Sequence, residues 1–188
     1  MLTLPNFLTL LRIIAVPVFL ILLADQQYGL GLVLFVLASI TDTVDGVIAR
    51  LTDAKSELGA TLDPLADKLL IVSAFVSLMW LGTIPVWLFI LVVTRDVIVV
   101  GGYLAIYFVT TPMDVRPSAI GKLNAFMQMS TIGFALVAMA RPDIYMRPIN
   151  LITFYGTGLT TALSGIHYVY SGLLWFQRQG PAEDGTAK

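Results

Sequence analysis

The feature that most constrains this chain is a succession of long apolar segments that are almost free of charge. Residues 29–40, GLGLVLFVLASI, contain no charged residue at all. A helix that crosses a bilayer needs about 20 mainly apolar residues. Segments of this kind lie at residues 6–24, 28–50, 64–82, 84–109, 118–140 and 149–177. They predict an all-α integral membrane protein with a bundle of six transmembrane helices.

The overall composition agrees with that prediction. The chain has 188 residues, of which 57% are hydrophobic and 12% are charged, whereas soluble domains carry about 25% charged residues. The length suits one compact bundle and not two domains. We therefore expect a single transmembrane domain over residues 1–177, followed by a polar tail at residues 178–188.

The distribution of lysine and arginine predicts an orientation. With six spans, both termini, the loop after the second span and the loop after the fourth span share one side of the membrane. Basic residues concentrate on that side, at Arg50, Lys55, Arg116, Lys122, Arg178 and Lys188, against Arg141 and Arg147 on the other side. Because cytoplasmic loops carry the excess of Lys and Arg, both termini are predicted to be cytosolic.

The residue inventory limits the chemistry. The chain has no cysteine, one histidine and a formal net charge of -1. Thiolate catalysis and Cys- or His-rich metal sites are therefore excluded, and nothing indicates a nucleic-acid partner. A bound metal would be held by oxygen ligands, which favours Mg²⁺ or Mn²⁺.

Four aspartates provide such ligands. Asp42 and Asp45 are spaced i, i+3, and Asp63 and Asp67 are spaced i, i+4, so each pair shares one face of a helix. The short linker between the two helices predicts antiparallel neighbours with both pairs at the same end. Four bare carboxylates would repel one another, whereas one divalent ion, or two about 3.5–4 Å apart, would be held by them.

Small residues and an arginine accompany the first acidic pair. Gly46 and Ala49 continue the stripe of Asp42 and Asp45, and leave a notch where a bulky group can approach the backbone. Arg50 offers a fork of donors suited to phosphate, and Gly59 can serve the turn into the next helix. A metal site, a notch and a phosphate clamp together suit a substrate that contains a pyrophosphate. Asp53 and Glu57 are expected to be solvated loop charges.

These residues form the pattern D-x-x-D-G-x-x-A-R, then eight residues, then G-x-x-x-D-x-x-x-D. It resembles the complete signature of the CDP-alcohol phosphatidyltransferase family. The resemblance implies an enzyme that moves a phosphatidyl group from CDP-diacylglycerol to an alcohol and releases CMP. It implies that the four aspartates are metal ligands, that Asp67 is also the general base, and that Gly46 and Ala49 make room for the cytidine. Members of this family are commonly homodimers.

Residues outside the signature extend the predicted site. Asn6, Thr9 and Arg12 recur at intervals of three near the start of the first span. The segment resembles the N-terminal segments of phosphatidylglycerophosphate and cardiolipin synthases of this family. We expect Asn6 and Thr9 to line the pyrophosphate site, with simple helix capping as the alternative. Arg12 is expected to pair with an acid or a phosphate.

Basic residues later in the chain are candidates for binding the acceptor. Arg95 interrupts the fourth span, and an intramembrane arginine is a functional candidate by default. Arg116 and Lys122 lie near the cytosolic start of the fifth span and could bind an acceptor phosphate. The excess of Lys and Arg that cytoplasmic loops carry explains them as well. Lys68 follows Asp67 at about 100° around the helix, where it would snorkel or balance charge.

The acceptor itself is less constrained. Glycerol-3-phosphate synthases of this family typically follow the span-four arginine with Glu and place another arginine eight residues on, whereas this chain has Asp96 and Tyr103. The segments TRDVIVV, RPSAIGKLNAFMQ and TTALSGIHYVYSG look more like cardiolipin synthases, which use phosphatidylglycerol. Phosphatidylglycerol is slightly favoured, and glycerol-3-phosphate is the alternative.

Two other classes of protein also place acids in a membrane. A Mg²⁺-dependent prenyltransferase is usually longer and lacks the D-G-x-x-A-R continuation, and a cation transporter does not explain the glycine, alanine and arginine at fixed offsets. We therefore expect a phospholipid-synthesising enzyme of a bacterial inner membrane, with its active site facing the cytosol.

Overall fold

Six α-helices make up the computed structural model, which describes residues 4–52, 57–109 and 118–178, with no strand among these residues. Side chains are described for residues 10–41, 68–102 and 118–174. The helices are α1 (Leu4–Ala24), α2 (Tyr28–Thr52), α3 (Glu57–Trp80), α4 (Val86–Val109), α5 (Ala119–Ala140) and α6 (Arg147–Arg178). The all-helical prediction is confirmed.

The helix boundaries match the predicted spans closely, with one substantial difference. α3 begins at Glu57 and not at residue 64. The prediction that Glu57 lies in a loop is therefore wrong, because Glu57 is the first residue of this helix. Its first two turns carry Glu57 and Asp63 among apolar residues, and these charges lowered the local hydropathy without preventing helix formation. Asp53 lies outside the described residues.

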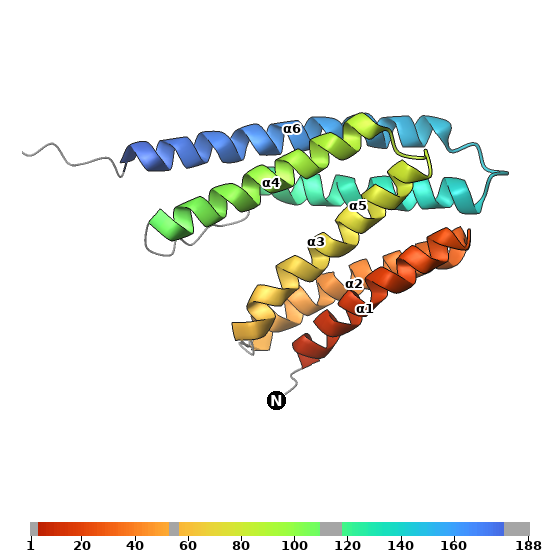
Figure 1. Ribbon diagram of the computed structural model, residues 1–188, viewed down its shortest axis with the longest axis horizontal. Helices are drawn as coiled ribbons and strands as arrows, with labels where there is room; N and C mark the ends of the chain where they lie inside the picture. Colours follow the sequence, from red (N-terminus) through yellow and green to blue (C-terminus); the bar gives the residue numbers. More distant parts are fainter. Residues whose placement is uncertain (1–3, 53–56, 110–117, 179–188) are drawn as a thin grey trace, which may run out of the picture.

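The helices alternate in direction along the chain (Figure 1). α1 packs against α2 and α3, α4 packs against α3 and α6, and α5 contacts α2, α3 and α6. α5 therefore joins the first three helices to the last. In Figure 1 the group formed by α1, α2 and α3 approaches the pair formed by α4 and α6 toward the right. The group and the pair diverge toward the left.

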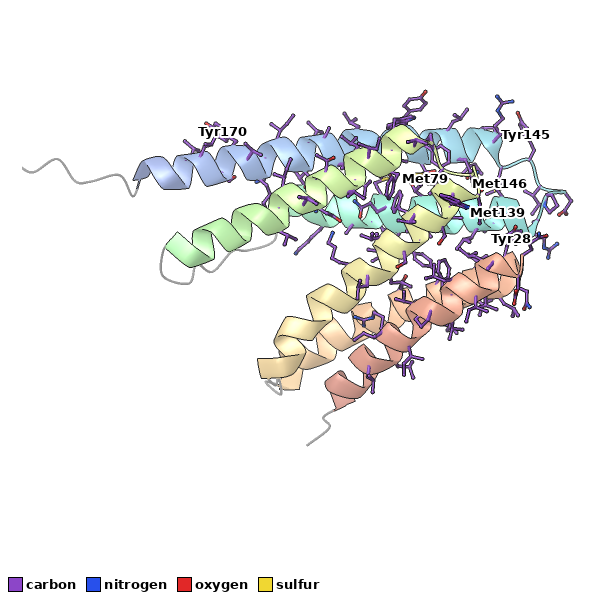
Figure 2. All side chains as sticks on the ribbon, viewed as in Figure 1. Tyr28, Met79, Met139, Tyr145, Met146 and Tyr170 are labelled. Atoms are coloured by element: carbon purple, nitrogen blue, oxygen red, sulfur yellow. The ribbon has the colours of Figure 1, made fainter. Side chains whose placement is uncertain are left out.

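The apolar core lies where these groups converge. Phe19, Phe75, Leu78, Leu88 and Leu136 are each 0% exposed and come from α1, α3, α4 and α5. Figure 2 shows Met79, Met139 and Met146 at this end of the bundle, while Tyr170 lies toward the opposite end of α6. Gly82, with φ of 74°, provides the left-handed residue that ends α3 and turns the chain into α4. The core therefore anchors one end of the bundle.

The distribution of polarity is consistent with a membrane protein. Large apolar side chains are exposed along every helix, including Ile21, Val33, Val97 and Ile152, whereas many polar side chains are buried. Contiguous exposed apolar surface marks an interaction with a membrane or another protein. Among the described residues, α5 alone is both long and apolar enough to cross a membrane, and shorter apolar stretches lie at Leu10–Ala24, Tyr28–Thr41 and Lys68–Trp80.

A glycine on α6 permits close packing against α4, and its replacement gives a test of this interface. A Cβ atom added at Gly158 would lie 2.8 Å from the ring of Trp87, which stacks on Tyr155 with ring centroids 5.8 Å apart. Gly158→Ala is therefore expected to destabilise the fold by about 1–3 kcal/mol through overpacking. Thermal unfolding in detergent, followed by tryptophan fluorescence, measures the change.

Gly156 on the same helix is the matched control. A Cβ atom there would meet only the Met127 sulfur at 3.7 Å, an ordinary contact. Gly156→Ala is expected to be neutral or to stabilise by about 0.5–1 kcal/mol, because alanine favours a helix over glycine. Equal unfolding midpoints for the two variants would show that Trp87 moves aside freely.

Candidate active site

The four aspartates of the signature lie on two consecutive helices. Asp42 and Asp45 belong to α2, and Asp63 and Asp67 belong to α3. Both segments have helical backbone, as the spacing predicted, while the side chains of residues 42–67 lie outside the described residues. The remaining signature residues, Gly46, Ala49, Arg50 and Gly59, are on the same two helical segments. The expectation that Gly59 serves the turn before the second of these helices is wrong, because α3 already begins at Glu57 and Gly59 is its third residue.

The helix boundaries place the two acidic pairs at similar depths. α2 ends at Thr52 and α3 begins at Glu57, so a short connection ties these two helix ends together. A helix rises about 1.5 Å per residue, which puts Asp45 and Asp63 about 10 Å and about 9 Å from the connected ends, and Asp42 and Asp67 about 15 Å from them. Because the helices run in opposite directions (Figure 1), the pairs lie at matching levels.

This donor set fits a hard divalent cation. It consists of four carboxylates in a chain without cysteine, and oxygen ligands of this kind are those that Mg²⁺ and Mn²⁺ prefer. Among the described side chains, no group of three or more His, Cys, Asp or Glu residues could hold a metal. A metal site built from the acidic residues of α2 and α3 is therefore compatible with both the donor chemistry and the helix geometry.

α1 lies against both acid-bearing helices and carries the N-terminal polar residues. Asn6 and Thr9 are in its first turns, with side chains outside the described residues. Arg12 is 3% exposed, although a guanidinium is costly to bury. Its burial on the helix that contacts α2 and α3 is consistent with the expectation that it serves an acid or a phosphate.

The three candidate acceptor-binding residues have different surroundings. Arg95 is buried on α4, at 9% exposure. Lys122 is exposed near the start of α5, and Arg116 lies outside the described residues. Tyr168, whose ring lies under the Arg95 guanidinium, also lies close to Gly121, the residue before Lys122: its hydroxyl would be 3.3 Å from a Cβ atom added at Gly121.

Arg95 is the centre of a buried polar network that links three helices. Its Nη1 donates to Asp96 Oδ1 at 2.8 Å, and its Nε and Nη2 donate to Ser164 Oγ at 3.2 Å and 2.7 Å. Its guanidinium carbon lies 5.3 Å from the centroid of the Tyr168 ring, a cation–π distance. Lys68 Nζ donates to Asp96 Oδ2 at 2.7 Å. The network therefore joins α3, α4 and α6.

A second polar cluster fills the contact between α5 and α6. Thr131 and Thr157 share a hydrogen bond of 2.8 Å, and Thr160 and Thr161 both donate to Asn124 Oδ1. These side chains, together with Gln128, are at most 9% exposed. Among the described residues, Gln128 Nε2 has no hydrogen-bond partner. The sequence signals for this cluster are the i, i+4, i+7 spacing of Asn124, Gln128 and Thr131 and the polar segment TTALSG, which were not among the predicted site residues.

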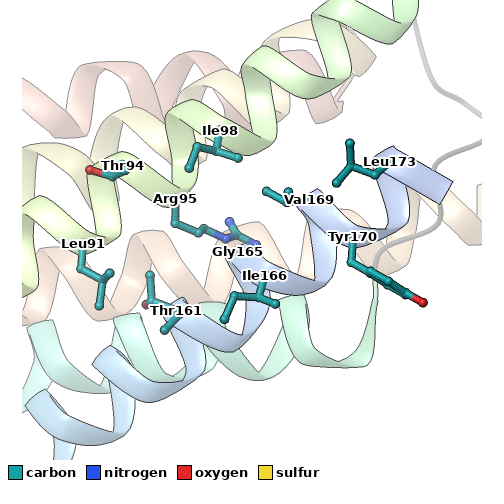
Figure 3. Close-up of a pocket in the computed structure, with 11 residues that line it drawn as sticks. Leu91, Thr94, Arg95, Ile98, Thr161, Gly165, Ile166, Val169, Tyr170 and Leu173 are labelled. Atoms are coloured by element: carbon teal, nitrogen blue, oxygen red, sulfur yellow. The ribbon is translucent and has the colours of Figure 1, made fainter. Parts of the chain in front are cut away.

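An apolar groove of about 530 Å³ runs between α4 and α6 (Figure 3). Its walls include Leu91, Ile98, Ile166, Val169 and Leu173. Figure 3 shows Arg95 extending from α4 toward Gly165, which lacks a side chain at this point. The buried guanidinium network therefore lies directly beside an apolar surface groove.

Comparison with known proteins places these features in a family. A family profile described as CDP-alcohol phosphatidyltransferase matches residues 2–164. The chain is 32% identical over 189 residues to human cardiolipin synthase (CMP-forming), with 90% of this chain and 62% of that protein covered. It is 30% identical over 197 residues to the CDP-diacylglycerol–glycerol-3-phosphate 3-phosphatidyltransferase of Bacillus subtilis, with 97% of each chain covered.

The coverage differs between the two kinds of relative. The chain spans between 56% and 62% of the length of the fly, human and rat cardiolipin synthases that it matches. It spans 92% of the glycerol-3-phosphate 3-phosphatidyltransferase of Rickettsia bellii, to which it is 32% identical over 171 residues, or 88% of this chain. With the family match over most of its length, this chain belongs to the CDP-alcohol phosphatidyltransferase family.

Proposed function

We propose that this chain is a membrane enzyme that transfers a phosphatidyl group from CDP-diacylglycerol to a glycerol-type alcohol and releases CMP. The observation that carries the proposal is the complete signature on two connected helices, with the acidic pairs of α2 and α3 at matching levels. The family match and the enzyme names of the relatives support the same reaction.

Most signature residues have a role in this proposal. Asp42, Asp45, Asp63 and Asp67 would hold one or two Mg²⁺ or Mn²⁺ ions, which supply positive charge to the pyrophosphate oxygens as the leaving group departs. Gly46 and Ala49 leave room for the cytidine, and Arg50, with Asn6 and Thr9, binds the pyrophosphate.

The transfer breaks one bond and forms one bond. The acceptor hydroxyl oxygen attacks the phosphorus that bears the diacylglycerol oxygen, and the bond from that phosphorus to the CMP oxygen breaks. Asp67 takes the proton from the acceptor hydroxyl, which is general base catalysis by a positioned carboxylate. The products are the new phospholipid and CMP.

The membrane arrangement belongs to the same proposal. All six helices would cross the bilayer, with both termini and the acidic ends of α2 and α3 on the cytosolic side of a bacterial inner membrane. Exposed apolar side chains on every helix and buried polar ones between the helices support insertion into the bilayer. The bias of Lys and Arg supports this orientation. The transmembrane domain would cover residues 1–177, the tail 178–188, and the active enzyme would be a homodimer.

Two acceptors are compatible with the chain. Phosphatidylglycerol is slightly favoured by the segments around Arg95, Lys122 and His167 and by the similarity to cardiolipin synthases. Glycerol-3-phosphate is the alternative, supported by relatives of that name that match over nearly their whole length. In either case Arg95, Arg116 and Lys122 are the candidates for the acceptor phosphate.

An acceptor screen tests the function. Purified full-length protein with labelled CDP-diacylglycerol and Mg²⁺ or Mn²⁺ is offered phosphatidylglycerol, glycerol-3-phosphate, inositol phosphate or serine, and the lipid product is identified. We expect metal-dependent CMP release and a new phospholipid with one of the first two acceptors. No CMP release with any acceptor contradicts the proposal and returns the prenyltransferase and the cation transporter as candidates.

A further inference from the structure

Asp96 occupies an unusual place in the buried network, because it holds two cations from different helices. Its Oδ2 accepts from Lys68 Nζ at 2.7 Å, and its Oδ1 accepts from Arg95 Nη1 at 2.8 Å. Its side chain is 9% exposed, while that of Lys68 is 36% exposed. A buried carboxylate with both oxygens engaged by cations is held more firmly than a surface ion pair.

The Arg95 end of this link is itself fixed. Three of its N–H groups are used on Asp96 and Ser164, and its guanidinium lies over Tyr168. Ser164 and Tyr168 both belong to α6. Asp96 therefore connects Lys68 on α3 to a part of α4 that is already clamped to α6.

The link lies well away from the turn that joins α3 and α4. α3 ends at Trp80 and α4 begins at Val86, which puts Lys68 and Asp96 about 18 Å and about 15 Å along their helices from that turn. Figure 1 shows the two helices diverging in this direction. Here a long lysine side chain spans the separation, and it does so at the residue next to Asp67.

Because successive residues of a helix are about 100° apart, fixing the direction of Lys68 fixes the directions of its neighbours. Relative to Lys68, Asp67 is rotated by about 100° and Asp63 by about 140°, so the two acids share a face that a rotation of α3 would turn away. Holding one residue beside them limits that rotation. The same link gives α3 a fixed distance from α4.

We propose that Asp96 is a positioning residue which, by holding Lys68 and Arg95 together, sets the rotation of α3 and so places Asp63 and Asp67 for phosphatidyl transfer. The inference rests on the proposed function of Asp63 and Asp67. In this arrangement Arg95 holds Asp96 in place, in addition to its candidate role of binding the acceptor phosphate.

The first test measures geometry and not activity. The chain has no cysteine, so spin labels attach only where cysteines are introduced. Leu69→Cys on α3 and Val97→Cys on α4 are suitable sites, because Leu69 is 43% exposed and Val97 is 65% exposed. We expect one narrow distance distribution in the otherwise unchanged protein, and a broadened or shifted distribution after Lys68→Met or Asp96→Asn.

The second test measures CMP release from CDP-diacylglycerol as a function of Mn²⁺ concentration. Lys68→Met breaks the α3–α4 link but leaves the Arg95–Asp96 pair intact, so it tests the link even if Asp96→Asn folds poorly. Each variant is expected to lose about 10–100-fold in activity or to need that much more Mn²⁺, as for residues that orient metal ligands. The double variant is expected to be little worse than either single variant, because both remove the same link.

Asp143→Asn is the matched control, since it makes the same carboxylate-to-amide change at an exposed loop position. Asp96→Glu, which keeps the charge, is expected to recover part of the activity. The proposal is overturned by unchanged distances and unchanged Mn²⁺ dependence in Lys68→Met, or by variants that lose only thermal stability. Failure of the wild-type protein to release CMP instead overturns the proposed function, and the role of Asp96 with it.

Discussion

Replacing Asp63 by asparagine is expected to abolish CMP release, with a loss of about 10³-fold or more. Asp63 supplies one of four carboxylates to the proposed metal site, and the change removes a negative charge while keeping the size of the side chain. Loss of a metal ion's stabilisation of the departing pyrophosphate is worth several kcal/mol, and about 4 kcal/mol corresponds to about 10³-fold in rate. Asp42→Asn, on the other acid-bearing helix, is expected to behave in the same way.

The measurement combines activity, metal binding and folding. CMP release from CDP-diacylglycerol is followed across Mg²⁺ and Mn²⁺ concentrations, Mn²⁺ binding is measured by electron paramagnetic resonance, and helix content is checked by circular dichroism. Asp25→Asn, at an exposed position after α1, is the matched control and is expected to be fully active. Full activity in either Asp42→Asn or Asp63→Asn would rule out the shared metal site.

The two substitutions also test whether α2 and α3 act as one site. If Asp42 and Asp63 hold the same metal ions, the double variant is expected to be no less active than the single variants, because the ions are already lost. Independent, multiplicative losses would mean that the two acidic pairs act separately.

The helices of this fold could be predicted from sequence because their signal is local. A run of about 20 apolar residues marks a helix without any knowledge of its neighbours, and five of the six helices begin within two residues of the predicted position. The exception, α3, begins with a polar segment that contains Glu57 and Asp63. There the local composition resembled a loop, and the helical spacing of Asp63 and Asp67 was the better guide.

The interior polar network could not be predicted in the same way. Lys68 and Asp96 are 28 positions apart, and Arg95 and Ser164 are 69 positions apart. No periodicity connects such pairs, because the contact depends on how the helices pack and not on how each one forms. The sequence marked Arg95 and Lys68 as residues of interest, and Lys68 does balance a charge, that of Asp96. It did not identify Asp96 as the partner, and it left Ser164 and Tyr168 unnoticed.

The signature residues were only partly predictable from the sequence. Its spacing predicted two acidic pairs on helical faces, and the helical backbone of α2 and α3 is present at both pairs. How the four carboxylates meet depends on the rotation and separation of the two helices, which sequence spacing does not specify. The proposed positioning role of Asp96 concerns the rotation of α3.

Replacing Asp67 by asparagine is expected to separate binding from catalysis. As the proposed general base, Asp67 accepts the proton of the acceptor hydroxyl, a role worth about 10²–10⁴-fold in rate. Asparagine keeps an oxygen that can face a metal ion but cannot accept that proton. We therefore expect CDP-diacylglycerol binding close to that of the wild type, together with a loss of turnover of this size. Equilibrium binding and single-turnover CMP release on the same preparation measure the two effects.

Comparison with Asp63→Asn identifies the role, because both residues lie on α3 one turn apart. Both substitutions remove a proposed metal ligand, so both are expected to weaken Mn²⁺ binding. At saturating Mn²⁺, Asp63→Asn is expected to recover part of its turnover, whereas Asp67→Asn, which also lacks the base, is expected to stay inactive while CDP-diacylglycerol remains bound. Identical profiles for the two variants would make Asp67 a metal ligand without a proton-transfer role. Turnover near the wild-type rate in Asp67→Asn would exclude Asp67 as the base. Another polar group near the acidic residues of α2 and α3 would then have to accept the proton of the acceptor hydroxyl.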